Sequence, residues 1–354
     1  MSRFLNKRYE NLEAYTPGEQ PRDMVYIKLN TNESPYPPAP SVVAAMNAQQ
    51  VENLRLYSDP TGLSLKQSLA GLYGLKTENI FISNGSDDIL IFAFMAFADD
   101  RGAAFADVSY GFYPVYAQLH NVKADIIPLE EDFSLDYRKY CGRNQMIVIA
   151  NPNAPTGMEI PLWQIEEILK SNPDSVVVID EAYVDFGGTS CYKMIESYVN
   201  LLVVRTFSKS RCLAGARLGY AFGSPELIED LEKLKYSTNP YNVNRLSMML
   251  GCKTVEAEAY YQEVSKKIQS ARAWTEKALA EQGFRVLPSK TNFIFASCPT
   301  ICGEDLYRGL RKRGVLVRHF TKERIKDFVR ITVGTQEQME KLLDAVKEMM
   351  GGTK

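Results

Sequence analysis

Val176-Val-Val-Ile-Asp-Glu-Ala-Tyr183 is the stretch that decides the fold, because four apolar β-branched residues lead directly into a carboxylate. An uninterrupted run of this kind predicts a short strand buried on both faces. Similar runs occur at Ala103–Ala106, Met146–Ala150 and Leu201–Val204, with helical stretches such as Leu162–Lys170 between some of them. Alternation of strands and helices predicts a mostly parallel sheet, so the expected fold class is α/β.

The regions before and after these runs differ in pattern. Leu63–Tyr73 has helical periodicity and stops at Gly74, Ile80–Ser83 predicts a further strand, and Asp87–Phe97 predicts a helix. Towards the C-terminus, Glu256–Glu281 predicts one long amphipathic helix. The segments predicted after it are the strands Thr291–Ala296, Val315–Arg318 and Phe328–Val333 and the helices Gly303–Arg313 and Gln336–Met350.

These patterns divide the chain into three parts. The polar start, interrupted by prolines, predicts an extended N-terminal arm over residues 1–30. We expect residues 46–255 to form a large domain in which helices sandwich the mostly parallel sheet. Residues 31–45 and 256–354 would together form a smaller α+β domain that caps the large one.

Composition argues against several classes of protein. The formal net charge of −2, from 41 basic and 43 acidic residues, gives no electrostatic footprint for nucleic acid or an anionic membrane. The six cysteines are scattered and the start of the chain has no apolar leader, which indicates a soluble cytoplasmic protein with reduced thiols. The two histidines lack metal-ligand spacing, so we expect neither a metal site nor a serine–histidine–aspartate triad.

Polar residues follow the predicted strands at the point where each strand ends. They are Asn84-Gly85-Ser86, the loop Asn151-Pro-Asn-Ala-Pro-Thr-Gly157, Asp180 and Ser208-Lys209. In an open parallel sheet, functional groups gather beyond the carboxyl ends of the strands, so these segments predict a single site. Taken one at a time, they have simpler explanations, such as an exposed lysine, a buried ion pair or a helix cap.

Two of these residues suit covalent chemistry on an aldehyde. Arg205 and Arg217, in the same segment as Lys209, favour the neutral amine, which is the form that attacks an aldehyde. Asp180 closes an apolar strand, where a buried carboxylate needs a partner. A protonated pyridine nitrogen would be such a partner, and the pair would keep the ring an electron sink.

The residues around Gly85 suit an anion. Gly85 and Ser86 begin a predicted helix, whose free N–H groups and dipole attract a phosphate. Ser208 and Arg217 would add a hydroxyl group and a cation to the same phosphate.

Further motifs along the chain carry a resemblance. They are Leu12-Glu-Ala-Tyr-Thr-Pro-Gly18, Lys28-Leu-Asn-Thr-Asn-Glu-Ser-Pro-Tyr36, Leu56-Tyr-Ser-Asp-Pro60, Asn84-Gly-Ser-Asp-Asp88, Asp180-Glu-Ala-Tyr183, Arg205-Thr-Phe-Ser-Lys209, Pro240-Tyr-Asn-Val-Asn244, Thr291-Asn-Phe293 and Val329-Arg-Ile-Thr-Val-Gly334. In this order the chain resembles the fold-type I aminotransferases, which use pyridoxal 5'-phosphate (PLP). Within them it is similar to the histidinol-phosphate aminotransferase family.

The resemblance implies a role for each site residue. Lys209 would bind PLP as a Schiff base and move the proton between the substrate's α-carbon and C4′ of the cofactor. Asp180 would pair with the ring nitrogen, Tyr183 would contact the phenolic oxygen, and Tyr110 would stack on the ring. The other cofactor-binding residues implied are Gly85, Ser86, Asp87, Ser208, Arg217 and, from the neighbouring subunit of a homodimer, Tyr57.

One position departs from the pattern of the family. An asparagine usually stands directly before Pro-Thr-Gly, where this chain has Ala154. Asn153 is our choice for a second contact to the phenolic oxygen, with Asn151 as the alternative. A cis peptide bond before Pro155 would redirect this loop.

The resemblance also implies anionic substrates. Arg330 is similar to the arginine that clamps the α-carboxylate of glutamate by a bidentate pair. Arg318 is similar to a residue that meets the phosphate of histidinol phosphate, although a solvated charge at a strand end is the alternative. The further substrate-pocket residues implied are Tyr15, Asn32 and Asn292.

The implied reaction is ping-pong transamination in histidine biosynthesis. Glutamate would give its amino group to PLP and leave as 2-oxoglutarate, and imidazole-acetol phosphate would then become histidinol phosphate. The alternatives are a threonine-phosphate decarboxylase and an aromatic or broad-specificity aminotransferase. A binding module without turnover is disfavoured by the intact Lys209, Asp180 and Arg217. A nucleotide-dependent oxidoreductase is disfavoured because no G-x-G-x-x-G follows a predicted strand.

Overall fold

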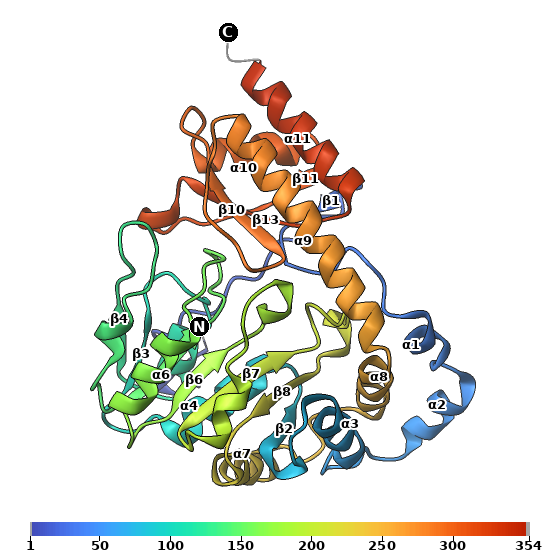
Figure 1. Cartoon of the computed structure of the whole chain (residues 1–354), viewed down its shortest axis with the longest axis vertical. Helices are drawn as coiled ribbons and strands as arrows, with labels where there is room; N and C mark the ends of the chain where they lie inside the picture. Colours follow the sequence, from blue (N-terminus) through green and yellow to red (C-terminus); the bar gives the residue numbers. More distant parts are fainter. Residues whose placement is uncertain (1, 352–354) are drawn as a thin grey trace.

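The computed structural model describes residues 2–351, and its largest element is a seven-stranded sheet (Figure 1). Its strands are β2 (Ile80–Ser83), β3 (Ala103–Ala106), β4 (Ala124–Ile127), β5 (Met146–Ala150), β6 (Val177–Asp180), β7 (Leu201–Thr206) and β8 (Gly219–Phe222). They lie in the order β2-β8-β7-β6-β5-β3-β4. Strand β8 is antiparallel to both of its neighbours, and every other neighbouring pair is parallel.

Helices cover both faces of this sheet. One face packs against α4 (Ser86–Phe97), α5 (Tyr113–Leu119) and α7 (Pro225–Thr238), and the other against α3 (Leu63–Tyr73), α6 (Leu162–Ser171) and α8 (Arg245–Glu256). Because side chains alternate along a strand, Val178 of β6 joins the first apolar cluster, while Val177 and Ile179 join the second. Asp180 therefore faces the side of α4 and α5.

A smaller unit stands above this sheet in Figure 1. Its four-stranded antiparallel sheet has the order β12-β13-β10-β9. The strands are β9 (Arg285–Val286), β10 (Phe293–Ser297), β12 (Arg318–His319) and β13 (Phe328–Thr332), and the helices beside them are α9 (Glu258–Glu281), α10 (Gly303–Lys312) and α11 (Gln336–Gly351). One apolar cluster joins the two units, because Tyr183 and Phe186 pack with Val264 and Ile268 of α9 and with Phe293 of β10.

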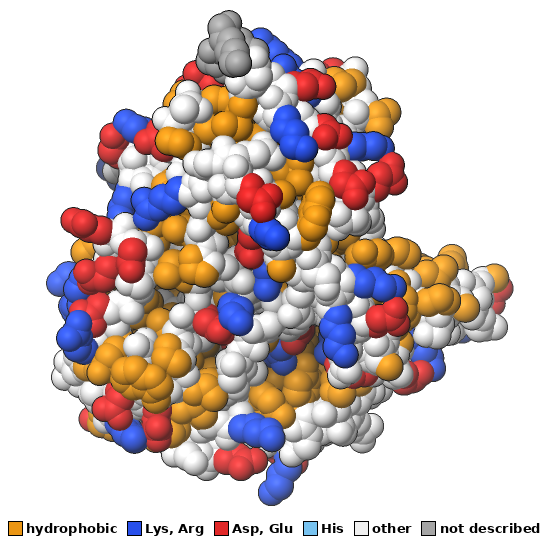
Figure 2. Space-filling view, turned by 45° about the horizontal axis from the view of Figure 1, so that its top comes forward, with side chains coloured by type: hydrophobic (Ala, Val, Ile, Leu, Met, Phe, Trp, Pro, Cys, Tyr) orange, Lys and Arg blue, Asp and Glu red, His pale blue; other side chains and the backbone are white. Residues whose placement is uncertain are grey.

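The first sixty residues run along both units. Strand β1 (Ile27–Lys28) pairs in parallel with β11 (Val315–Leu316) of the smaller unit. The short helices α1 (Pro40–Ala44) and α2 (Ala48–Glu52) then form a projection on the right of Figure 1. Figure 2 shows hydrophobic side chains gathered on this projection. The exposed apolar residues of this segment are Val43, Met46, Val51, Leu54 and Leu56.

The predicted α/β fold class is confirmed, and two of the predicted elements are divided in the structure. Glu256–Glu281 was expected to be one helix, but α8 ends at Glu256 and α9 begins at Glu258, because Ala257 has non-helical angles of φ −96° and ψ 26°. Val315–Arg318 was expected to be one strand. It forms two, because Val315 and Leu316 pair with β1, whereas Arg318 and His319 pair with β13.

Side-chain charge along the surface is mixed. Positively charged lysines and arginines are intermixed with negatively charged carboxylates over the face shown in Figure 2. The helices within residues 2–351 are too short or too polar to cross a lipid bilayer.

We expect the central strand to dominate the stability of the large sheet. Ile179 is fully buried in β6, so Ile179→Ala should lower the free energy of unfolding by about 2–5 kcal/mol through lost burial and a cavity. Ile126, on the edge strand β4, is 53% exposed, so Ile126→Ala should change it by less than about 0.5 kcal/mol. Urea denaturation of the two variants measures both values, and equal losses would contradict this account of the core.

Candidate functional site

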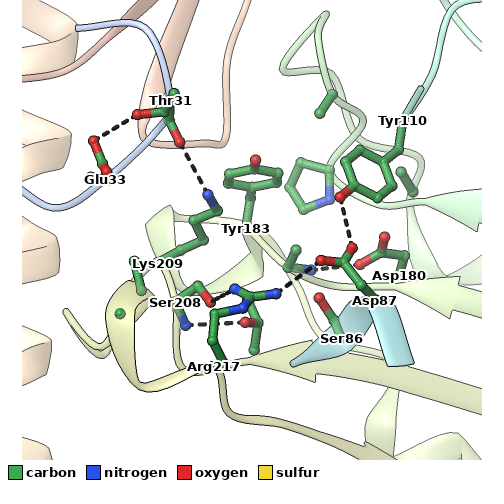
Figure 3. Close-up of a pocket in the computed structure, with 17 residues that line it drawn as sticks. Thr31, Glu33, Ser86, Asp87, Tyr110, Asp180, Tyr183, Ser208, Lys209 and Arg217 are labelled. Carbon is green, nitrogen blue, oxygen red and sulfur yellow. Dashed lines mark hydrogen bonds and ion pairs between the residues drawn. The ribbon is translucent and has the colours of Figure 1, made fainter. Parts of the chain in front are cut away.

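A cavity of about 340 Å³ opens where β5, β6 and β7 of the large sheet end, with Thr31 and Glu33 of the N-terminal segment in its wall (Figure 3). Because these strands are parallel neighbours, their C-terminal ends meet at one edge of the sheet. The strand ends supply Ala150, Asp180 and Thr206 to its wall, and Lys209 follows β7. The structure therefore brings most of the polar residues predicted from the sequence into one site.

Lys209 extends into this cavity from the loop after β7 (Figure 3). Its Nζ donates a hydrogen bond of 3.3 Å to the backbone oxygen of Thr31 and lies 5.8 Å from the centre of the Tyr183 ring. The single long bond to a carbonyl leaves the amine available to another group in the cavity.

Asp180 is a buried carboxylate with neutral partners. It is 5% exposed, and it accepts hydrogen bonds of 2.9 Å from the Tyr113 hydroxyl and 3.1 Å from the Ala182 amide. Burial raises the pKa of Asp180 to about 6, against the opposing effect of these two bonds. A cation in the cavity would relieve this cost, so the site favours a ligand with a protonated nitrogen at this point.

An anion-binding cradle is built at the start of α4. Gly85 precedes the helix at φ +89°, a backbone conformation that L side chains rarely adopt, and Ser86 begins it. Gly85 and Gly219 keep the cradle open, because a side chain at either glycine would fill it: a Cβ on Gly85 would lie 2.8 Å from Nη2 of Arg217. A Cβ on Gly219 would lie 2.5 Å from the backbone nitrogen of Ser86. The free N–H groups of a helix start attract anions.

Side chains complete this cradle. Arg217 pairs with Asp87, Nη2 to Oδ2 at 3.0 Å, and its Nη1 lies 3.4 Å from the Ser208 hydroxyl. Asp87 also accepts hydrogen bonds from the hydroxyl groups of Tyr110, at 2.7 Å, and Tyr116, at 3.2 Å. Burial, and next the charge of Asp87, raise the pKa of Tyr110 well above its ordinary value, so this tyrosine remains a donor.

Tyr183 is tied to the smaller unit through Asn32. The hydroxyl of Tyr183 accepts a hydrogen bond of 2.9 Å from Nδ2 of Asn32. Asn32 makes two hydrogen bonds with the hydroxyl of Thr332: its backbone N–H donates at 2.9 Å, and its Oδ1 accepts at 3.0 Å. Asn292 donates to the backbone oxygen of Asn32 at 3.0 Å, and all of these groups are buried.

A second cavity of about 430 Å³ adjoins the first, with Tyr110 and Ala154 in the walls of both. Tyr15, Arg318 and Arg330 line it. Arg318 and Arg330 lie directly opposite each other on β12 and β13, an arrangement that costs free energy for like charges.

These two arginines contact backbone oxygens. Arg318 donates to the carbonyls of Thr16 and Pro17, at 3.0 and 3.1 Å, and Arg330 to that of Asn30 at 3.1 Å. Within residues 2–351 no carboxylate pairs with either, and burial lowers the pKa of Arg330. An anion in this cavity would therefore be attracted by both.

The loop that holds Asn153 differs from the prediction. Nδ2 of Asn153 donates to the Val108 carbonyl and to Thr156, both at 2.9 Å, and its Oδ1 accepts from Ser109. Asn151 is likewise engaged, with the backbone of Ile160. Neither side chain lines the first cavity, whereas Ala154 does, so the structure does not bring either asparagine to the expected place. The peptide bonds before Pro152 and Pro155 are both cis.

Tyr57 lies outside both cavities in the single chain. It is 79% exposed, and its ring stacks on that of Tyr241 with 4.6 Å between centres. Its position beside the apolar projection of α1 and α2 leaves it available to a neighbouring molecule.

Several residues at the site were not predicted as site residues, among them Thr31, Glu33 and Tyr113. Thr31 and Glu33 line the first cavity, and Tyr113 holds Asp180. Although burial opposes it, hydrogen bonds from Lys28 and Thr31 lower the pKa of Glu33, so it is a carboxylate. Thr31 and Glu33 lie within a motif already singled out, next to Asn32, and could have been found there. Tyr113 could not, because only the packing of α5 brings it to β6.

Comparison with known proteins gives this geometry a family. The model of the family described as aminotransferase class I and II matches residues 25–346. A histidinol-phosphate aminotransferase of Clostridium acetobutylicum is 48% identical over 349 residues, 98% of this chain and 99% of the relative. A histidinol-phosphate aminotransferase of Brachyspira hyodysenteriae is 48% identical over 350 residues, which cover 98% of this chain and 99% of that relative.

Solved structures agree on the fold. The crystal structure of a histidinol-phosphate aminotransferase from Clostridium acetobutylicum has a TM-score of 0.85 at 25% identity, covering 92% of this chain and 99% of its own. The crystal structure of the Sinorhizobium meliloti enzyme in complex with pyridoxal-5'-phosphate has a TM-score of 0.83 at 24% identity, covering 93% of this chain and 92% of its own. Within residues 2–351, no cluster of three or more metal-binding side chains is arranged to hold an ion. The match to the family model and the two relatives at 48% identity show that the chain belongs to the aminotransferase class I and II family and, within it, to the histidinol-phosphate aminotransferases.

Proposed function

We propose that the chain catalyses PLP-dependent transamination between histidinol phosphate and 2-oxoglutarate, giving imidazole-acetol phosphate and glutamate, in histidine biosynthesis. The observation that carries the proposal is the pair of adjoining cavities. One holds an amine, a buried carboxylate and an anion cradle, and the other holds two opposed arginines without a carboxylate partner. The names of the relatives, at 48% identity over nearly the full length, support the same reaction.

The residues of the first cavity fit PLP group by group. Lys209 offers an amine for the aldehyde, and Asp180, whose pKa is raised by burial, offers the anion that a protonated pyridine nitrogen needs. Gly85 and Ser86 leave room and N–H groups for the phosphate, next to Arg217. When bound, PLP supplies an electron sink for the bond that is broken at the substrate.

The chain's own residues have separate tasks in this reaction. Lys209 would hold the cofactor by its aldehyde group, and its amine would move the proton to and from the substrate's α-carbon. Asp180 keeps the ring nitrogen protonated, because its charge favours the cation in a buried site. The Tyr183 hydroxyl, oriented by Asn32, and the Tyr110 ring would help to hold the cofactor, because both residues line the cavity.

The second cavity would hold the substrate's anionic end. Arg330 is assigned to the α-carboxylate of glutamate and Arg318 to the phosphate of histidinol phosphate, with Tyr15 beside them. Asn32 and Asn292 line neither cavity, and they act on the site through Tyr183: Asn292 donates to the backbone oxygen of Asn32, which donates to the Tyr183 hydroxyl. Two opposed cations suit a site that accepts a dicarboxylate and a phosphate monoester in alternate half-reactions, as a ping-pong mechanism requires.

The assembly and location belong to the same proposal. We infer a homodimer in which Tyr57 reaches the phosphate of the neighbouring subunit's cofactor, supported by its exposure and by the apolar projection beside it. A cytoplasmic location is supported by six cysteines that are all free thiols.

The proposed reaction is tested by its half-reactions. Histidinol phosphate added to PLP-loaded protein should remove the cofactor's visible absorbance band, and 2-oxoglutarate should restore it. Lys209→Ala is the control and should show neither change, because it lacks the amine. If the band does not respond and threonine phosphate releases carbon dioxide instead, the protein is the decarboxylase. Equal turnover of aromatic amino acids would indicate a broad-specificity enzyme.

The two arginines should separate the substrates. Arg318→Gln should lower kcat/KM for histidinol phosphate by about 10–100-fold, with a smaller loss for glutamate, and Arg330→Gln should do the reverse. Steady-state kinetics of both half-reactions measure this. Arg308→Gln, on the exposed face of α10, is the matched control and should leave both values unchanged. Identical losses for both substrates would contradict the division of roles.

Asp180→Asn separates stability from catalysis. Because burial raises the pKa of Asp180 from 3.8 to about 6, the folded cofactor-free protein loses stability as pH rises through this window. The variant escapes this loss, so its Tm relative to wild type should increase from about pH 4 to about pH 7. Its turnover with PLP should fall about 100-fold or more. A pH-independent difference in Tm, or normal turnover, would contradict the assignment.

A further inference from the structure

One face of the long helix α9 holds the loop that follows Tyr183. Ser265 and Arg272 are seven residues apart, which is two turns, so they lie on the same face. Ser265 donates to the backbone oxygen of Asp185 at 2.5 Å, and Nη1 of Arg272 donates to that of Phe186 at 2.9 Å. Both oxygens belong to the 3-10 helix Val184–Phe186, which begins directly after Tyr183.

Arg272 also reaches the smaller sheet. The same Nη1 donates to the backbone oxygen of Thr291, the residue before Asn292. Asn292 donates to the backbone of Asn32, and Asn32 donates to the hydroxyl of Tyr183. The contacts therefore form a closed circuit that starts and ends at Arg272. It joins the end of the large sheet, the N-terminal segment and the smaller sheet.

The surroundings of Arg272 show that it does not bind a ligand itself. Its side chain is only 9% exposed and lines neither of the two cavities. Its Nε lies 3.7 Å from Oε1 of Glu276, one turn further along α9, and neither atom has a hydrogen-bond partner within residues 2–351. The cation is thus balanced inside its own helix, while its donors serve two backbone carbonyls.

We propose that Arg272 is a positioning residue for the reaction, which holds Tyr183, Asn32 and Asn292 in place from the long helix. The inference rests on the proposed function. A guanidinium group suits this task because the two N–H groups of Nη1 are held in the plane of the group and can each serve one carbonyl, whereas the ammonium of a lysine is a point charge that rotates on a flexible stem. Without Arg272, the loops that contain Phe186 and Thr291 lose the side chain that joins them. A misplacement of about 1 Å at a reacting group can cost about 100-fold in rate.

The test is a double-mutant cycle between Arg272→Met and Tyr183→Phe. Arg272→Met should lower kcat by about 10–100-fold in the wild-type background, with little change in KM, and by less than about threefold in Tyr183→Phe. The smaller effect is expected because the hydroxyl that the circuit orients is then absent. Thr275→Val is the matched control: Thr275 is buried on the same helix, and its hydroxyl donates to the backbone oxygen of Ala271 in that helix, so its loss should lower Tm but leave kcat unchanged.

A second readout needs neither substrate nor cofactor. Hydrogen exchange in the cofactor-free protein should become faster in residues 184–187 and 290–293 of Arg272→Met and remain unchanged there in Thr275→Val. Arg272→Lys, which keeps the charge, serves if the methionine variant does not fold, and it should show the same pattern because its flexible ammonium group does not hold the two donors in fixed directions.

The outcomes distinguish the two proposals. Equal losses of kcat in both backgrounds, or unchanged exchange in the two loops, would overturn the positioning role and leave Arg272 as a stabilising residue. If wild type does not turn over histidinol phosphate, the proposed function fails. The exchange measurement still decides whether Arg272 holds the loops, and the cycle is then run with whichever amine changes the cofactor spectrum.

Discussion

The carboxylate of Asp180 stands at the end of the central strand of a seven-stranded sheet, in a position almost closed to water. The free-energy cost of removing this carboxylate from water is the constraint on which the rest of the site depends. Tyr113 of α5 and the Ala182 amide compensate part of the cost, and the rest raises the pKa. The site is therefore incomplete without a cation, and the neighbouring parallel strands bring an amine and an anion cradle to the same edge. One unfavourable burial thus specifies the kind of ligand.

Much of this arrangement could be predicted from the sequence because local signals determined it. The β-branched run before Asp180 and the runs at 103–106, 146–150 and 201–204 identified strands of the large sheet, and the rule for strand ends then placed Lys209 and Ser86 together. The helix Leu63–Tyr73 was also predicted with the observed bounds, since periodicity and a following glycine mark both of its ends.

What could not be predicted depends on contacts between distant segments. Strand β8 runs against its neighbours, and nothing within Gly219–Phe222 shows its direction. The break between α8 and α9 at Ala257 could not be predicted, because no glycine or proline stands at this position. Asn153 was predicted from its place in a motif, but in the fold its side-chain amide forms hydrogen bonds with Val108, Thr156 and Ser109. Such competition between partners is decided only by packing.

The pairing of Arg217 with Asp87 has a consequence for how a phosphate is retained. About half of the arginine side chain is exposed, so the pair is screened and its exchange for another anion has a small net cost. A free phosphate ion must compete with a carboxylate that is permanently present. A phosphate on a molecule anchored at Lys209 competes at the high effective concentration of a tethered group. The cradle would therefore discriminate by attachment more than by charge, and inorganic phosphate in the cell would be a weak competitor.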